Sequence, residues 1–320
     1  MTESGADVVV LRQKIHGMGA DEYAEELRLR LPDHEIVQAE TPADERRLLA
    51  DAPVATGFAL DPADLTETLE YFACVFAGTD HLPLEALAEH DIALTNAAGV
   101  HGPNVSEQVL GYLLTFARNL HEGWRRARNR EWRSYQTREL TGSTVAVVGL
   151  GSLGRAVVER LQAFDVTTIG IRHSPEKGGP TDEVLGYDDD VHRAFARADY
   201  LVVTAPLTDL TEGLIDAEVF RTLPSDSVLV NVGRGPIIET DALVEALRGN
   251  AIRGAALDVT DPEPLPEEHP LWGFENIVIT PHNAGHTPAY WERMAEIVAA
   301  NVNRAEEQGG YEGLQNQVQF

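Results

Sequence analysis

The sequence predicts an α/β protein built on two parallel sheets, and three observations lead to that prediction. With 320 residues, the chain is long enough for two domains. Short apolar segments alternate with helical or proline-punctuated ones, as strand–helix–strand units require. Finally, the segment from Thr144 to Gly154 reads T-V-A-V-V-G-L-G-S-L-G, a β-branched strand that leads into a glycine-rich turn and a helix-compatible run.

Five short strands are expected in the first hundred residues, at Val8 to Leu11, Glu35 to Val37, Val54 to Thr56, Tyr71 to Phe76 and Ala93 to Thr95. A helix begins near Asp21, with acidic residues in its first turn. The Gly17-Met18-Gly19 turn before it lacks a third glycine and is interpreted as an ordinary loop. Cys74 is the one cysteine, so no disulfide can form within the chain, and a buried inert thiol is expected.

Two loops of this predicted sheet follow the carboxyl ends of strands, where open α/β sheets bind ligands. They are Ala77-Gly78-Thr79-Asp80 and the segment from Asn96 to Val100. Position alone fits plain strand-to-helix turns equally well.

A long helix is expected from Val105 to about Leu120, with Asn104 and Glu107 spaced as a capping pair. The polar, arginine-rich stretch from Arg125 to Arg138 follows and is interpreted as the crossing into a second domain.

The glycines of G-x-G-x-x-G have distinct expected roles in binding a dinucleotide. Gly149 allows the tight turn, Gly151 lets the backbone approach a pyrophosphate, and Gly154 lets the helix pack on its strand. The phosphates would lie on free N–H groups of the first helical turn, which includes Ser152 and Leu153. Glycine-rich turns also occur for purely steric reasons, but the strand and helix on either side favour cofactor binding.

The residue after the next strand, Val166 to Ile171, bears on the choice of dinucleotide. An NAD site carries an acidic residue there to bind the ribose hydroxyls, whereas this chain has Arg172, with His173 and Ser174 beside it. An arginine suits a 2′-phosphate, so NADP is preferred, with NAD possible. The alternative is a solvated loop arginine.

Further strands are expected at Tyr200 to Thr204, Val228 to Val232 and Gly254 to Leu257. Their carboxyl ends are where the nicotinamide end of a cofactor would bind, at Thr204, Ala205, Pro206 and Val232. Asp188-Asp189-Asp190 precedes a helical run and is interpreted as a solvated helix start. No metal site is expected.

The charge of the chain is strongly one-sided. Asp and Glu number 52 against 25 Lys and Arg, which gives a formal net charge of −27, and only two lysines occur, Lys14 and Lys177. Such a field disfavours nucleic acid and anionic membranes as partners. The pattern resembles proteins of salt-in halophiles. No signal peptide or membrane-spanning run is recognised, so a cytoplasmic protein is expected.

Three loop residues suggest the chemistry: Arg234 in N-V-G-R-G-P, Glu263 in D-P-E-P-L-P and His282 in T-P-H-N-A-G. Each alone could be an ordinary loop residue. Beside a nicotinamide site, Arg234 would bind a substrate carboxylate and polarise its carbonyl, and His282 would protonate the carbonyl oxygen. Glu263 would orient the imidazole and stabilise its cationic form.

Taken together, these motifs resemble the D-isomer-specific 2-hydroxyacid dehydrogenase family over nearly the whole chain. The stretches concerned are V-V-G-L-G-S-L-G, A-P-L-T-D-L-T, N-V-G-R-G-P-I-I-E-T-D-A-L, A-A-L-D-V-T-D-P-E-P-L-P and T-P-H-N-A-G. The resemblance implies that Arg234, Glu263 and His282 are the catalytic set and that Asp258 contacts the nicotinamide end. It also implies that Ala77, Gly78 and Thr79 offer backbone N–H groups to the substrate carboxylate.

The resemblance also implies a domain layout and a reaction. A Rossmann coenzyme domain, residues 101–287, is inserted into a flavodoxin-like substrate domain, residues 1–100 and 288–320, whose last helix runs from about Pro288 to Glu307. The reaction is reduction of a small 2-keto acid to a D-2-hydroxy acid, in a homodimer joined through the coenzyme domains. A catalytically silent dinucleotide sensor on the same scaffold is the alternative.

Overall fold

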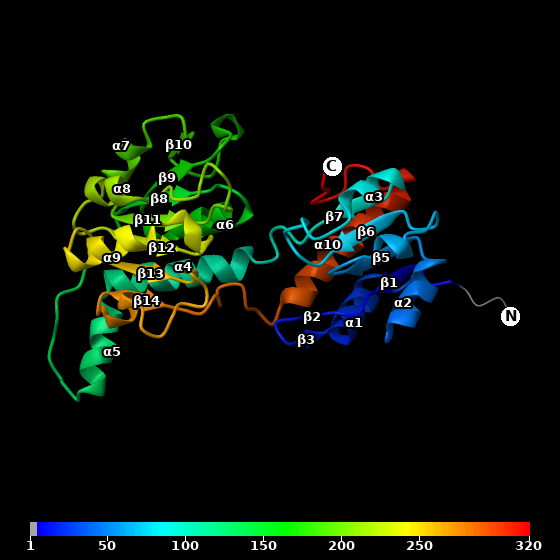
Figure 1. Cartoon of the computed structure of the whole chain (residues 1–320), viewed down its shortest axis with the longest axis horizontal. Coiled ribbons are helices and arrows are strands. Elements are labelled where there is room, and N and C mark those ends of the chain that lie inside the picture. The colour runs from blue at the N-terminus through cyan, green and yellow to red at the C-terminus, as the bar shows by residue number, and fades with distance from the viewer. Residues whose placement is uncertain (1–4) are drawn as a thin grey trace. The chain divides into compact units, whose positions relative to one another are not determined.

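The computed structural model describes residues 5–320 and divides into two compact units. One unit extends to His101 and resumes at Thr287, and the other spans Gly102–His286. Each unit has its own parallel sheet with helices on both faces (Figure 1). The predicted α/β class with two doubly wound parallel sheets is therefore confirmed.

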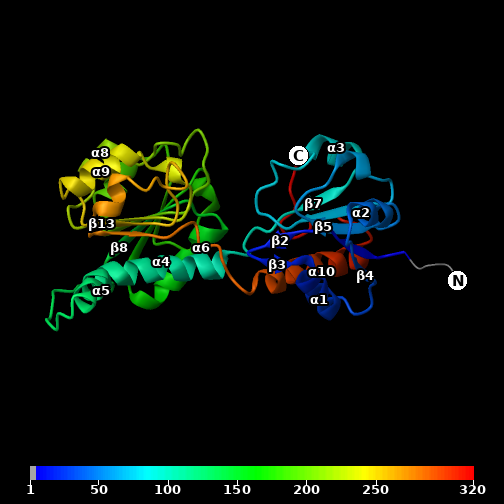
Figure 2. The same cartoon turned by 60° about the horizontal axis from the view of Figure 1, so that its bottom comes forward.

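The sheet of the first unit has five parallel strands in the order β4-β1-β5-β6-β7, the flavodoxin-like order. Helices α1 and α10 cover one face, and α2 and α3 cover the other (Figure 2). The strands are β1 (Val8–Val10), β4 (Ile36–Gln38), β5 (Val54–Gly57), β6 (Tyr71–Cys74) and β7 (Ala93–Thr95), and a small hairpin pairs β2 (Lys14–Ile15) with β3 (Met18–Gly19). The helices are α1 (Ala20–Arg30), α2 (Pro42–Leu49), α3 (Leu84–Glu89) and α10 (Tyr290–Gln308).

The sheet of the second unit has seven parallel strands in the order β10-β9-β8-β11-β12-β13-β14, which extends the Rossmann order by one strand. The strands are β8 (Thr144–Val148), β9 (Thr167–Ile171), β10 (Glu183–Leu185), β11 (Tyr200–Val203), β12 (Val228–Asn231), β13 (Gly254–Leu257) and β14 (Ile277–Ile279). The helices are α4 (Gly102–Ala117), α5 (Leu120–Arg128), α6 (Ser152–Leu161), α7 (Val191–Phe195), α8 (Ala217–Thr222) and α9 (Thr240–Arg248).

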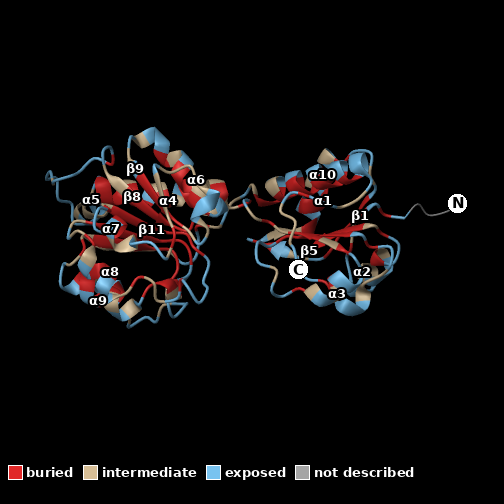
Figure 3. Cartoon of the chain, turned by 90° about the horizontal axis from the view of Figure 1, so that it is seen from above, coloured by how far each residue is buried: buried red, intermediate tan, exposed pale blue. Residues whose placement is uncertain are grey.

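Alternation along each strand explains why both faces of this sheet are covered. In β8, Ala146 and Val148 pack toward the cluster that contains residues of α7, α8 and α9, while Val145 and Val147 pack toward α4 and α6. The strands and the inner faces of the helices form the buried layer in Figure 3, and the outer faces of the helices are exposed. Because both faces of the sheet pack against apolar side chains of helices, the sequence of each strand is a nearly continuous hydrophobic run.

The prediction of one helix from Val105 to Leu120 was wrong. The helix begins at Gly102 and ends at Ala117, and a second helix, α5, follows Asn119, whose left-handed φ of 48° ends the first. Asn104 therefore lies inside the first turn and does not cap it. Its amide instead donates to the carbonyl of Ala284, at 2.6 Å.

The interpretation of the Arg125 to Arg138 stretch as a crossing between domains was also wrong. The stretch lies within the Gly102–His286 unit, because α4 already packs on α6 of that unit. Strands β10 and β14, which have three residues each and lie at the two edges of the sheet, were not predicted. Among the described residues, no helix has the length and apolar content needed to span a membrane.

Candidate active site

Most of the predicted site residues of the second unit follow the carboxyl end of a strand. Gly149 follows β8, Arg172 follows β9, Thr204 follows β11, Val232 follows β12 and Asp258 follows β13. The loop that carries His282 follows β14. Because all seven strands are parallel, these loops share one edge of the sheet, which is the ligand edge of a doubly wound fold.

The glycine-rich turn has the sterics that a dinucleotide-binding turn needs. Gly149 has a φ of +95°, and a Cβ there would lie 2.6 Å from the backbone nitrogen of Ala205. A Cβ on Gly154 would lie 1.9 Å from the carbonyl oxygen of Gly149. By contrast, a Cβ on Gly151 would meet no atom within 4 Å, so the protein itself does not require glycine at that position.

The residues around this turn use their polar groups in different ways. The hydroxyl of Thr204 is buried and donates to the carbonyl of Gly149 at 2.7 Å, so it supports the turn. Ala205 and Val232 are buried, and Pro206 is exposed. The first-turn amides of α6, which include those of Ser152 and Leu153, have no intrahelical acceptor and remain available to an anion.

Arg172 is half-buried and lies against the short turn Pro175–Lys177. Its Nη1 donates to the carbonyl oxygen of Gly178 at 2.6 Å, and the Nη2 of Arg155 on α6 approaches the same oxygen at 3.4 Å. The Nε of Arg172 is buried and has no hydrogen-bond partner among the described residues. His173 is exposed and Ser174 is partly exposed beside it.

His282 and Glu263 are in direct contact. The Nδ1 of His282 and the Oε1 of Glu263 are 2.5 Å apart, with side chains 50% and 40% exposed. That bond leaves the Nε2 of His282 as the ring nitrogen facing away from the carboxylate, which is the arrangement of an oriented general acid/base. A cavity of about 560 Å³ lies beside the pair and is lined by Leu265, Trp272 and Thr280, among others.

The buried carboxylate of Asp258 holds the loop that carries His282. Its two oxygens accept from the backbone N–H groups of Asn283 and Ala284, both at 2.9 Å, and its backbone carbonyl accepts from the N–H of His282 at 2.7 Å. His282 has a φ of +51°, a left-handed conformation that costs a non-glycine residue about 1 kcal/mol or more. These three bonds explain how the loop keeps that conformation.

Arg234 is exposed and contacts its own loop. Its Nη1 donates to the carbonyl of Gly233 at 2.8 Å. The fully buried Asn231 braces that loop, because its amide donates to the carbonyl of Arg234 and its oxygen accepts from the N–H of Gly233, both at 3.0 Å. Within the described chain, no hydrogen bond or ion pair joins Arg234 to His282 or Glu263, so the direct contact among the three predicted catalytic residues is the one between His282 and Glu263.

In the first unit, the loop Ala77-Gly78-Thr79 follows β6 and is largely exposed. The amide of Asn96 fixes it by donating to the carbonyl of Ala77 at 2.7 Å. None of the described residues accepts a hydrogen bond from the backbone N–H groups of Ala77, Gly78 or Thr79. Three adjacent backbone donors of this loop are therefore unused within the described part of the chain.

Sequence reasoning missed three residues that support these loops: Asn231, Thr280 and Tyr112. Asn231 and Thr280 lie inside the motifs quoted for Arg234 and His282, so their polar side chains in otherwise apolar strand ends were a usable signal. Tyr112 lies on α4, and nothing in its local sequence indicates that its hydroxyl reaches Thr280.

Comparison with known proteins gives matches over most of the chain. The profile of "D-isomer specific 2-hydroxyacid dehydrogenase, NAD binding domain" matches residues 110–284. A glyoxylate reductase of Thermofilum pendens is 34% identical over 75% of this chain and 72% of its own, and an uncharacterized protein in the proB 3′ region of Corynebacterium melassecola is 37% identical over 79% and 84%.

Among solved structures, a D-isomer specific 2-hydroxyacid dehydrogenase of Xanthobacter autotrophicus Py2, in complex with NADPH and MES, is 25% identical with a TM-score of 0.76. The match covers 98% of each chain. Sequence, fold and motifs thus agree over most of the molecule. The chain belongs to the D-isomer specific 2-hydroxyacid dehydrogenase family, whose members are NAD(P)-dependent oxidoreductases acting on 2-hydroxy and 2-keto acids.

Proposed function

We propose that this enzyme reduces 2-keto acids to D-2-hydroxy acids with NADPH as the preferred cofactor and with His282 as the general acid/base. The observation that carries the proposal is the 2.5 Å contact between His282 Nδ1 and Glu263 Oε1 at the ligand edge of the coenzyme sheet. The carboxylate holds the ring so that Nε2 carries the exchangeable proton. General acid catalysis of this kind contributes roughly 10²- to 10⁴-fold to the rate.

The surroundings of the other predicted site residues support a role for each in the reaction. Arg234 would bind the carboxylate and the carbonyl oxygen of the substrate through its planar fork, since its guanidinium is exposed and has one bond to its own loop. The unused amides of Ala77, Gly78 and Thr79 would also bind the substrate carboxylate. The reduced nicotinamide, when bound, supplies the hydride. His282 gives its proton to the carbonyl oxygen during reduction and takes it back in the reverse direction.

The residues around the glycine turn fit a phosphorylated dinucleotide. The open space at Gly151 and the unpaired first-turn amides of α6, Ser152 and Leu153 included, would hold the pyrophosphate. The other residues of the proposed cofactor site are Gly149, Gly154, His173, Ser174, Thr204, Ala205, Pro206, Val232 and Asp258. Of these, Thr204 and Asp258 would shape the site by holding its loops, because their side-chain oxygens already bond to the protein.

The preference for NADP rests on Arg172. Its buried Nε lacks a partner, and one of its terminal nitrogens is fixed on Gly178, so the guanidinium is held in place with a donor unused. A 2′-phosphate would accept from it and would also lie near Arg155. The X. autotrophicus relative was solved with NADPH, which supports the same choice.

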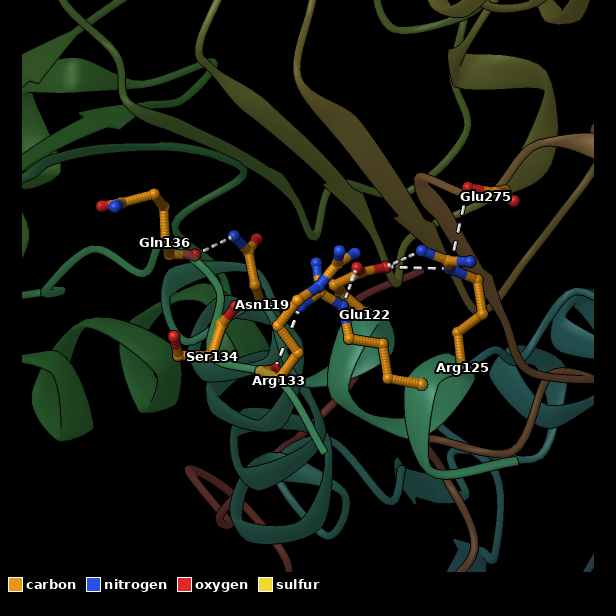
Figure 4. A network of polar contacts seen from close by, with 8 residues as sticks. Asn119, Glu122, Arg125, Arg133, Ser134, Gln136 and Glu275 are labelled. Carbon is orange, nitrogen blue, oxygen red and sulfur yellow. Dashed lines mark hydrogen bonds and ion pairs between the residues drawn. The ribbon is translucent and has the colours of Figure 1, made fainter. Parts of the chain in front are cut away.

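We also propose a homodimer joined through the segment from Arg118 to Arg138, here called the arm. The arm contains seven arginines and two glutamates in a chain of net charge −27. It holds its own shape, because Glu122 pairs with Arg125 and Asn119 donates to the carbonyl of Gln136 at 2.6 Å (Figure 4). No residue of α5 is buried, and Trp132 is fully exposed. An acidic second copy of this chain is the partner that such a basic, aromatic surface fits.

One assay separates the proposed enzyme from a dinucleotide sensor. NADPH and NADH oxidation would be followed in molar KCl over a panel of 2-keto acids, from glyoxylate and hydroxypyruvate to bulkier acids. We expect turnover with NADPH, a loss of at least about 10²-fold in kcat for His282→Gln and a smaller loss for Glu263→Gln. NADPH binding without turnover of any 2-keto acid would favour the sensor, and wild-type activity of His282→Gln would refute the role of His282.

A further inference from the structure

A chain of hydrogen bonds runs from helix α4 to the loop of His282. The hydroxyl of Tyr112 is 2.5 Å from the Oγ1 of Thr280, and Thr280 in turn donates to the Oδ1 of Asp258. Asp258 accepts from the backbone N–H groups of Asn283 and Ala284, the two residues after His282. This series of hydrogen bonds thus begins on a helix and ends on the two backbone amides that follow the proposed acid/base.

The chemistry of the three side chains decides which one donates and which one accepts in each of these hydrogen bonds. Asp258, which accepts two amide N–H bonds, is an acceptor, so the single proton of the Thr280 hydroxyl is given to it. The oxygen of Thr280 must then accept from the Tyr112 hydroxyl. Burial raises the pKa of Tyr112, which keeps this hydroxyl protonated and able to donate over the pH range of an assay.

The loop needs such support because of its backbone. His282 has a left-handed φ of +51°, and the loop begins directly after the three-residue edge strand β14. Thr280 is also tied to the sheet through its N–H, which donates to the carbonyl of Leu257 at 2.9 Å. At the far end of the loop, Asn104 on α4 donates to the carbonyl of Ala284, so α4 bonds to both ends of the loop.

We propose that Tyr112 and Thr280 are positioning residues for the reaction, which act through Asp258 to hold the His282 ring where it can transfer its proton. This proposal rests on the role of His282 proposed above. The bonds restrain a strained loop, and a displacement of about 1 Å at a catalytic group can cost on the order of 10²-fold in rate. Because the restraint comes from α4, its loss should change catalysis more than it changes cofactor binding.

The test compares four variants of the full chain in steady-state NADPH-dependent turnover. Thr280→Val removes the hydroxyl and keeps the shape, and we expect kcat to fall about 10-fold or more while the Kd for NADPH stays within about 2-fold. Tyr112→Phe should lower kcat about 3-fold. Thr280→Ser should restore near wild-type kcat, because the hydroxyl returns. Tyr200→Phe removes a hydroxyl at the amino end of β11, at the opposite edge of the sheet, and should leave kcat unchanged.

Hydrogen–deuterium exchange of the peptide that contains residues 280–286 provides a readout that needs no turnover. Faster exchange there in Thr280→Val and Tyr112→Phe, at an unchanged melting temperature, would support the proposal. Wild-type kcat and wild-type exchange in Thr280→Val would overturn it, and so would a fall in melting temperature without a fall in kcat. If His282→Gln retained activity while exchange changed as expected, only the role of His282 would be refuted, since the restraint on the loop would still be demonstrated.

Discussion

The guanidinium of Arg172 has one nitrogen held by a hydrogen bond and another that is buried without a hydrogen-bond partner, which is unusual for a charged side chain. Its Nη1 bonds to Gly178, and its buried Nε has no partner among the described residues. A buried donor without an acceptor costs about 1–3 kcal/mol. A phosphate that reached this group would recover that energy, whereas the hydroxyls of an NAD ribose are much weaker acceptors.

Replacing Arg172 by Asp should therefore reverse the cofactor preference. A charge-assisted hydrogen bond contributes about 1.5–3 kcal/mol, so we expect the ratio of kcat/KM for NADPH to that for NADH to fall at least about 10-fold. The measurement is initial-rate kinetics with both cofactors at one salt concentration. Arg221→Asp, on the exposed surface of α8, is the matched control for charge reversal. An unchanged ratio would mean that Arg172 is a structural arginine.

Some residues of the proposed site could be predicted from the sequence, and others could not. Gly149, Glu263 and His282 could be found because each lies in a motif whose spacing has a chemical meaning. The supports of the site could not, because the Tyr112–Thr280 pair joins residues 168 positions apart in the sequence. Such contacts depend on how α4 packs on the sheet, and one sequence carries no local record of that packing.

Some helices and strands, too, could be predicted from the sequence and others could not. The apolar runs predicted β7 and β13 to the residue, since buried parallel strands have a nearly continuous hydrophobic sequence. The prediction of one continuous helix through Asn119 was wrong. Asn119 ends α4 by adopting a left-handed φ, and the sequence has no glycine or proline there that would indicate a helix end. Edge strand β14, which leads into the His282 loop, was not predicted, although β7, an edge strand of the same length, was.

The glycine turn permits a test that separates fold from ligand binding. Gly151→Ala adds a methyl group where no protein atom lies within 4 Å, so the melting temperature of the cofactor-free protein should stay nearly unchanged while the Kd for NADPH rises. Gly154→Ala places a Cβ against the carbonyl of Gly149 and should destabilise the fold by about 1–3 kcal/mol. Thermal melts and NADPH titrations of both variants provide the measurement. Tight NADPH binding by Gly151→Ala would argue against a pyrophosphate there.

For the whole molecule, the acidic surface predicts a dependence on salt. A net charge of −27 produces self-repulsion that mobile ions screen, so we expect the melting temperature to rise from low to molar KCl. Differential scanning fluorimetry over a KCl series tests this, with a sucrose series to separate charge screening from general stabilisation by excluded solutes. A melting temperature that is constant across the KCl series would contradict the halophilic interpretation.

The arm predicts the oligomeric state. If two chains of 35.0 kDa associate through it, sedimentation should give twice that mass, and Trp132→Ala should weaken the dimer by about 30-fold or more in Kd, as for an interface hot spot. Arg130→Glu should act in the same direction by repelling an acidic partner. Trp272→Ala, an exposed tryptophan outside the arm, is the control. A wild-type monomer at micromolar concentration would refute the arm as an interface.

The scarcity of lysine has a practical consequence for studying this enzyme. Only Lys14 and Lys177 carry side-chain amines, both exposed, and Lys177 ends the turn that receives the Arg172 bond at Gly178. Once the α-amino group is blocked, an amine-reactive fluorophore on a Lys14→Arg variant would therefore label one side chain beside the proposed phosphate pocket. Its emission would report occupancy of that pocket directly, without a catalytic readout.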